Sequence, residues 1–266
     1  MQQENNVMGD FLKDLMQKGK REDGRTAMDY RNIAIRTNVM PNAEGSAEVT
    51  MGHTKVLAGV KVGLGAPMRD KPNEGNLMTA AELLPLASRY YEPGPPSPDA
   101  VELARVIDRG IRAANVIDME ALFVEPEKVW EVFIDIYILN YHGNLFDAGT
   151  LAATAALKSA RMPKAEKVGE EITVIREGNL GKLKTKNVVT SCTFGKLFGT
   201  PILDPDGNEE SFMDARVTIA NDENVVRAMQ KGLGGSFSTK ELDELLDVAF
   251  EKSKGMRNMI SNAAGE

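Results

Sequence analysis

The chain has 266 residues, of which 42% are hydrophobic and 27% charged, and this suits one large or two small soluble domains. A net charge of −7 excludes a stand-alone nucleic-acid binder of the basic type, so any contact with RNA needs a local patch or a basic partner. One cysteine excludes an internal disulfide, and two histidines make a structural metal site unexpected. No apolar run is long enough to span a membrane. A cytoplasmic protein is therefore expected.

The first third of the chain predicts a short helix followed by antiparallel strands. Apolar residues at helical spacing favour a helix over residues 8–19, with Gly19 able to close it. Residues 32–66 alternate between apolar and polar side chains and are punctuated by glycines, which predicts strands. Residues 77–87 are apolar but ambiguous, and the proline-rich residues 92–99 predict an exposed connection.

The middle of the chain predicts a helix, a long strand and a second helix. Residues 99–115 favour a helix with Asp99 as the N-cap, and residues 128–140 favour a strand with one buried and one half-buried face. A small turn at residues 142–147 then leads into a helix that runs to Ala160 and stops before Pro163.

The last third repeats this plan on a smaller scale. Residues 162–186 are charged, contain one strand candidate at ITVIRE, and make a plausible domain boundary. Four strands are predicted in NVVTSCTFG, TPILDP, ARVTIAN and NVVRAMQ, and a terminal helix begins at Ser238 with a capping box to Glu241. The fold class is therefore α+β, with two similar subdomains of sheet plus helix. We expect an N-terminal helix and lead-in segment at 1–25, an N-terminal domain at 26–165 and a C-terminal domain at 186–260.

The turn before the second long helix has the shape of a phosphate-binding corner but carries Phe146 and Asp147 and no cation. Asp147 stands where an N-cap belongs, and its carboxylate would accept bonds from the first amides of the helix. Capping is the interpretation that we favour over a catalytic role. A free phosphate would then meet a negative charge.

Three arginines, Arg105, Arg109 and Arg112, share one face of the predicted helix at 99–115. The apolar Leu103, Ile107, Ile111 and Ala114 share another face and are predicted core. Two interpretations remain open. The arginines form a solvated face, with pairs from Glu102 to Arg105 and from Asp108 to Arg112, or they contact phosphates.

Five acids gather in LDPDGNEESFMD: Asp204, Asp206, Glu209, Glu210 and Asp214. Their spacing excludes an EF-hand. Residues 206–210 are interpreted as a solvated acidic turn. Asp214 is either a strand-end residue or an acid or metal ligand, and the spacing alone does not decide.

Several of these stretches together resemble the ribonuclease PH family over residues 21–250. They are REDGRTAMDYR, AEGSAEVTMGHTKVLAGV, VELARVIDRGIR and LDPDGNEESFMDARVTIA. The resemblance implies a ribonuclease PH-like fold and places the family's catalytic acid at Asp214. Two features of active members are missing. Their phosphate-binding turn is replaced by residues 143–147, and their arginine pair before the central helix is replaced by residues 97–100.

NEGNL, ELLPLA, EPGPP and GNLFDA make the chain similar to the non-catalytic ribonuclease PH-like subunits of archaeal exosomes. That resemblance implies no catalytic residue, no cofactor and no metal. It implies a catalytic paralogue as partner, in three heterodimers that form a hexameric ring, with RNA-binding cap subunits and single-stranded RNA. Arg105 and Arg109, and less firmly Arg112, would hold RNA phosphates. The alternatives are an independent phosphate-dependent 3′-to-5′ exoribonuclease that uses Asp214, and a ring scaffold without RNA contact.

Overall fold

The computed structural model describes residues 2–168, 171–178 and 181–265. Its helices are α1 (Gln2–Gln17), α2 (Pro98–Ala113), α3 (Leu145–Ser159), α4 (Gly207–Glu210) and α5 (Thr239–Ala264). The strands of the first half are β1 (Ile33–Thr37), β2 (Gly45–Met51), β3 (Thr54–Gly65), β4 (Asn76–Leu83), β5 (Phe123–Glu125) and β6 (Lys128–Asn140). Those of the second half are β7 (Arg161–Met162), β8 (Lys164–Val168), β9 (Glu171–Ile175), β10 (Gly181–Lys182), β11 (Thr190–Leu197), β12 (Thr200–Leu203), β13 (Met213–Asn221) and β14 (Val226–Gly232).

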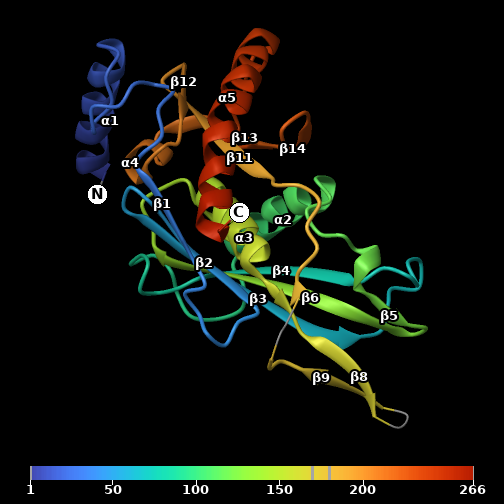
Figure 1. The fold of residues 1–266 in the computed structure, drawn as a ribbon. Coiled ribbons are helices and arrows are strands. Elements are labelled where there is room, and N and C mark those ends of the chain that lie inside the picture. The colour runs from blue at the N-terminus through green and yellow to red at the C-terminus, as the bar shows by residue number, and fades with distance from the viewer. Residues whose placement is uncertain (1, 169–170, 179–180, 266) are drawn as a thin grey trace.

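Two sheets enclose a layer of helices (Figure 1). The larger sheet has the order β1-β2-β3-β6-β4, with β5 also paired to β6. It is mixed, because β4 runs parallel to β6 while the other pairs are antiparallel. The smaller sheet is antiparallel, in the order β12-β11-β13-β14. The architecture is therefore α+β, as the sequence predicted.

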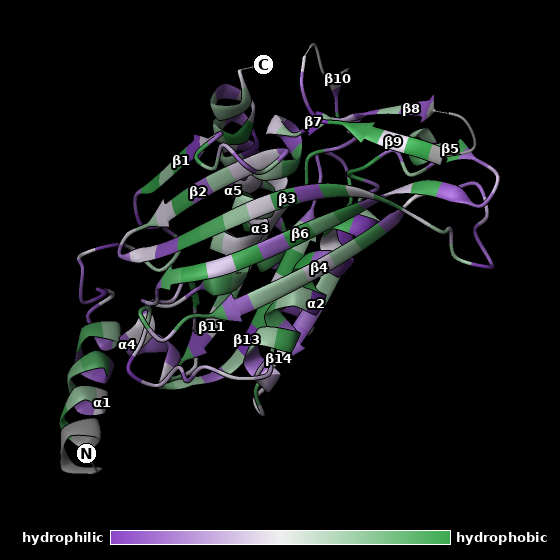
Figure 2. Cartoon of the chain, turned by 90° about the horizontal axis from the view of Figure 1, so that it is seen from below, coloured by the Kyte–Doolittle hydropathy of each residue, from purple (hydrophilic) through white to green (hydrophobic). Residues whose placement is uncertain are grey.

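Helices α2, α3 and α5 each contact both sheets, and this makes one continuous core. Viewed from below, the strands of the larger sheet lie in front of these helices and show alternating polar and apolar residues (Figure 2). In β6 the predicted buried face is confirmed, since Val132, Ile134 and Ile136 are at most 1% exposed. Period-2 alternation is enough to specify this strand because one face packs on helices and the other does not.

Helix α3 is buried along nearly its whole length, which its small side chains permit. The predicted close-packing face is confirmed, because Ala148, Leu151, Ala152, Ala155 and Ala156 are all 0% exposed. A Cβ at Gly45 of β2 would lie 2.3 Å from the carbonyl oxygen of Ala156. Only glycine therefore lets β2 approach α3 this closely.

Several other predictions are borne out, and one ambiguity is resolved. Residues 76–83, within and next to the ambiguous apolar stretch, form β4. The strand candidate at 172–177 is β9, which pairs with β8. The four strands predicted in the last third are β11 to β14, and Ser238 and Glu241 form the capping box of α5. None of the helices in the described ranges is long and apolar enough to cross a membrane.

Candidate functional site

Helix α2 begins one residue earlier than predicted, and its cap is Ser97 rather than Asp99. The Ser97 hydroxyl accepts a hydrogen bond from the backbone nitrogen of Ala100 at 3.2 Å. Pro98 occupies the first helical position, where its missing N–H costs nothing, so the cap must precede it. Asp99 lies in the first turn, where its charge still favours the helix dipole.

The arginines of α2 stand on its exposed face, as predicted. Leu103, Ile107 and Ile111 are at most 2% exposed, while Arg105, Arg109 and Arg112 are all exposed. Seven residues separate Arg105 from Arg112, so the arginine face extends about 10 Å along the helix axis.

The three arginines differ in their partners. The Arg112 Nε donates to Asp108 at 2.7 Å, which confirms the predicted pair, and its guanidinium also donates to the carbonyl of Leu77. Arg109 donates to the amide oxygen of Gln230 at 2.6 Å. Arg105 makes no hydrogen bond or ion pair within the part of the chain that the structure describes.

The predicted pair from Glu102 to Arg105 is wrong. Glu102 instead accepts from Arg216 of β13 at 2.6 Å. Arg216 comes from a distant part of the sequence, so helical spacing gave no sign of it. As a result, no carboxylate of the described residues offsets the charge of Arg105.

Two hollows border the arginine face. One of about 470 Å³ is lined by Pro96, Val101, Arg105, Arg109 and Gln230 among others. The second, of about 370 Å³, lies between the guanidinium groups and Asp108. The face therefore offers cations at the edges of open, partly apolar depressions.

The corner before α3 is capped by Asn144, and the prediction of Asp147 as the N-cap is wrong. Asn144 adopts a left-handed conformation with φ of 52°, which asparagine tolerates better than most residues. Asp147 lies three residues after this cap, in the first turn of α3, and is 0% exposed. It is the third residue of α3, where a carboxylate still interacts well with the dipole.

Asp147 is held by donors from three separate segments. The hydroxyl of Tyr30, the side-chain amide of Asn144, and both the backbone nitrogen and the hydroxyl of Thr193 donate to it at 2.8–2.9 Å. Burial nevertheless raises the pKa of Asp147 to about 6, because desolvation outweighs these donors. The side chain thus ties the segment just before β1 and the smaller sheet to the start of α3.

The acidic segment that follows β12 is buried, so the prediction of a solvated turn at 206–210 is wrong. Asp204, Asp206 and Glu209 are at most 5% exposed. Distant cations compensate two of them. Arg21 pairs with Glu209, and Asp204 pairs with Arg31 at 2.7 Å and with Arg25 at 3.0 Å. The guanidinium of Arg31 lowers the pKa of Asp204.

Glu210 completes the corner. It accepts from the backbone nitrogen of Asn144 at 2.8 Å and from the hydroxyl of Tyr141 at 2.6 Å. Burial raises its pKa. Around the start of α3 the chain thus places the carboxylates of Asp147, Asp204 and Glu210. A phosphate dianion would be repelled where a helix N-terminus would otherwise attract it.

Asp214 belongs to the smaller sheet. It is exposed at the start of β13, and its side chain has no hydrogen bond or ion pair in the described ranges. Two residues further along the same strand face, Arg216 lies over the ring of Phe146 with its guanidinium carbon 4.3 Å from the ring centroid. A cation held by Glu102 therefore stands beside the corner, and sequence reasoning missed it.

No group of three or more metal-ligating side chains is found in the described residues. His53 and His142 meet edge to face, with ring centroids 5.4 Å apart. Asn144 and Arg31, which organise the corner, were also missed as functional positions. The one available signal was the position of Arg31 inside the quoted motif REDGRTAMDYR.

Comparison with known proteins gives matches along the whole chain. Residues 29–163 match domain 1 of the 3′ exoribonuclease family (RNase PH), and residues 187–252 match domain 2. The exosome complex component Rrp42 of Thermococcus gammatolerans is 44% identical over 261 residues, covering 97% of this chain and 96% of that protein. The Rrp42 of Pyrococcus furiosus is 42% identical over 262 residues, covering 97% and 94%.

Two solved structures are also similar. A chain of the Archaeoglobus fulgidus exosome with RNA bound to the active site superposes with a TM-score of 0.87 and 38% identity, covering 96% of this chain and 98% of that one. A chain of an archaeal exosome core superposes with a TM-score of 0.84 and 35% identity, covering 97% of each.

Proposed function

The chain belongs to the ribonuclease PH family of 3′ exoribonucleases, and on that premise we propose that it is a non-catalytic subunit of an exosome. It works in a hexameric ring of three heterodimers with a catalytic ribonuclease PH-like paralogue, beneath RNA-binding cap subunits. The names of its relatives, both exosome components, support this placement. The subunit shapes the active site of the paralogue and helps to hold single-stranded RNA.

The observation that carries the proposal is the filled corner at the start of α3. Phosphorolysis needs a bound phosphate in line with the scissile bond and cations to neutralise it. Here Glu210 accepts from the backbone nitrogen of Asn144, and the buried carboxylate of Asp147 lies one turn further on. On this proposal the subunit contributes no catalytic residue of its own.

RNA binding falls to the arginine face of α2. Arg105 and Arg109 are exposed, and Arg105 has no partner among the residues that the structure describes. In a chain of net charge −7, such a local cluster is the feature suited to phosphates. Arg112 contributes less charge because Asp108 neutralises it at 2.7 Å.

The surroundings of Cys192 suit a reducing cytoplasm. The thiol is fully buried, and burial raises its pKa to about 12, so it is neither a nucleophile nor open to disulfide formation. A chain with one cysteine forms no internal disulfide, and this agrees with the proposed action in a reducing cytoplasm.

The test is a ring reconstituted with the charge-reversal pair Arg105→Glu and Arg109→Glu. Assembly should stay intact by size-exclusion chromatography, while RNA affinity and the rate of RNA degradation should both fall. Arg161→Glu, at an exposed arginine of β7, is the matched control. Unchanged RNA affinity in the double variant would favour the scaffold without RNA contact.

A further inference from the structure

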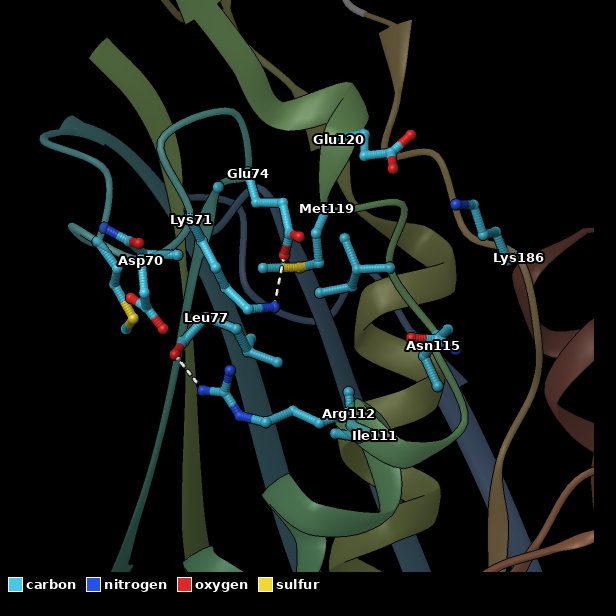
Figure 3. Close-up of a pocket in the computed structure, with 15 residues that line it drawn as sticks. Asp70, Lys71, Glu74, Leu77, Ile111, Arg112, Asn115, Met119, Glu120 and Lys186 are labelled. Atoms are coloured by element: carbon cyan, nitrogen blue, oxygen red, sulfur yellow. Dashed lines mark hydrogen bonds and ion pairs between the residues drawn. The ribbon is translucent and has the colours of Figure 1, made fainter. Parts of the chain in front are cut away.

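A pocket of about 340 Å³ lies where the carboxyl end of α2 meets the start of β4 and the loop at residues 66–75 (Figure 3). Its size is at the lower end of the range, about 300–1,000 Å³, that is usual for small-ligand sites. Arg112 lines this pocket and also the hollow that it shares with Arg105 and Arg109. The pocket therefore continues the arginine face at its carboxyl end.

The charges that line the pocket are balanced. The cations are Lys71, Arg112 and Lys186, and the acids are Asp70, Glu74 and Glu120. Lys71 is paired with Glu74 at 2.7 Å, and Lys186 with Asp118 at 2.9 Å. The carboxyl end of α2 adds partial negative charge. The lining thus favours neither a free phosphate nor a bare cation.

Hydrogen-bonding capacity remains open in this lining. The side chains of Asp70, Asn115 and Glu120 make no hydrogen bond to any described residue. Asn115 has a φ of 48°, a conformation that asparagine accepts just past a helix end. Leu77, Ile111 and Met119 add apolar surface beside them.

The guanidinium of Arg112 is fixed at the edge of the pocket. Its bonds to Asp108 and to the carbonyl of Leu77 hold the group in place, so its flat face is pre-organised. Figure 3 shows the bond to Leu77. RNA-binding proteins stack exposed bases on such guanidinium planes and bind their edges with amides and carboxylates. A neutral, planar ligand rich in donors and acceptors matches this set.

We propose that this pocket receives one base of the single-stranded RNA that lies along the arginine face. The inference rests on the proposed RNA contact of that face. Carboxylates accept hydrogen bonds, so Asp70 and Glu120 match bases that present an exocyclic amino group, as adenine and cytosine do. Uracil has no such group and fits the pocket least well.

The experiment compares labelled oligo(A), oligo(C) and oligo(U) on the reconstituted ring in phosphate-free buffer, which prevents phosphorolysis. Fluorescence anisotropy gives the affinities of the wild type and of a Glu120→Ala variant. Glu120 is exposed, so the variant should fold. Asp247→Ala, at an exposed carboxylate of α5, is the control.

The pocket variant should lose threefold or more in affinity for oligo(A) and oligo(C) and keep its affinity for oligo(U). Equal losses for all three polymers, or no loss for any, would overturn the proposal. Failure of the proposed function is distinguishable. In that case Arg105→Glu with Arg109→Glu would leave the binding of all three polymers unchanged.

Discussion

Neutralising the arginines of α2 one at a time should reveal how many phosphates this face holds. Arg105 has no partner in the described chain, Arg109 donates to an uncharged amide, and Arg112 is paired with Asp108. The expected order of effect on the salt dependence of RNA affinity is therefore Arg105 and Arg109 first, with Arg112 well behind. Alanine is the substitution of choice because it removes charge without adding repulsion.

The magnitude follows from counterion release. Each phosphate contact on single-stranded nucleic acid contributes about −0.7 to the slope of log K against log salt. Arg105→Ala with Arg109→Ala should therefore make the slope shallower by about 1.4. An exposed contact worth about 1 kcal/mol corresponds to about a fivefold loss of affinity for each arginine. Arg112→Ala should leave the salt slope nearly unchanged, since Asp108 already offsets the charge of Arg112, and any affinity that it loses should come from the lost stacking of a base.

The assay is anisotropy of labelled single-stranded RNA on the reconstituted ring, without phosphate, over a series of salt concentrations. Arg161→Ala of β7 is an exposed arginine whose side chain has no bond in the described ranges, and it should leave the slope unchanged. A double variant with the wild-type slope would refute phosphate binding by this face. A change of salt slope in Arg112→Ala larger than that in Arg105→Ala would refute the argument from internal pairing.

Three further predictions concern the buried corner. Burial raises the pKa of Asp147 to about 6 in the folded state, above its ordinary value of about 3.8. The stability that this carboxyl contributes is therefore complete below about pH 3.8 and is lost as the pH rises to about 6. In urea titrations between about pH 4 and pH 7, the free energy of unfolding of the wild type should therefore fall by up to about 3 kcal/mol relative to that of Asp147→Asn. A difference between the two proteins that stays constant with pH would contradict this. Arg31→Ala breaks a buried pair with Asp204 and should lower the free energy of unfolding in guanidinium by about 3–5 kcal/mol. Arg36→Ala, which breaks an exposed pair, is the control and should cost less than about 1 kcal/mol. Similar losses in the two variants would count against the argument from burial. Gly143 has a φ of +83°, and a Cβ at this position would lie 2.4 Å from the backbone of Asp206. Gly143→Ala should therefore lower the melting temperature markedly. A melting temperature equal to that of the wild type would disprove the close approach.

The elements that sequence predicted well are those with local, repetitive signals. The alternation in β6 placed Val132, Ile134 and Ile136 on the buried face because each strand residue points opposite to the next. The capping box of α5 needs only Ser238 and Glu241, three residues apart. The apolar stretch at residues 77–87, which overlaps β4, is ambiguous in sequence, since a short apolar run fits either a helix or a strand until its partner strand is known.

The candidate site was only half predictable for the same reason. The exposed face of α2 follows from helical spacing, and so does the pair from Asp108 to Arg112. The partner of Glu102 is Arg216, and the partners of the buried acids come from residues 21–31, all far away in the sequence. The segment that was predicted to be a solvated turn is buried, and its acids form ion pairs. No local pattern records which distant cation meets a given acid.

The most direct test of the account is phosphate-dependent release of nucleoside diphosphates from RNA with a single-stranded 3′ tail. The assay is run with this chain alone and then with its purified catalytic paralogue. The account predicts no release by the chain alone, because carboxylates occupy the corner where phosphate would bind, and activity once the paralogue is added. Robust release by the chain alone, abolished by Asp214→Asn, would contradict it and establish an independent exoribonuclease.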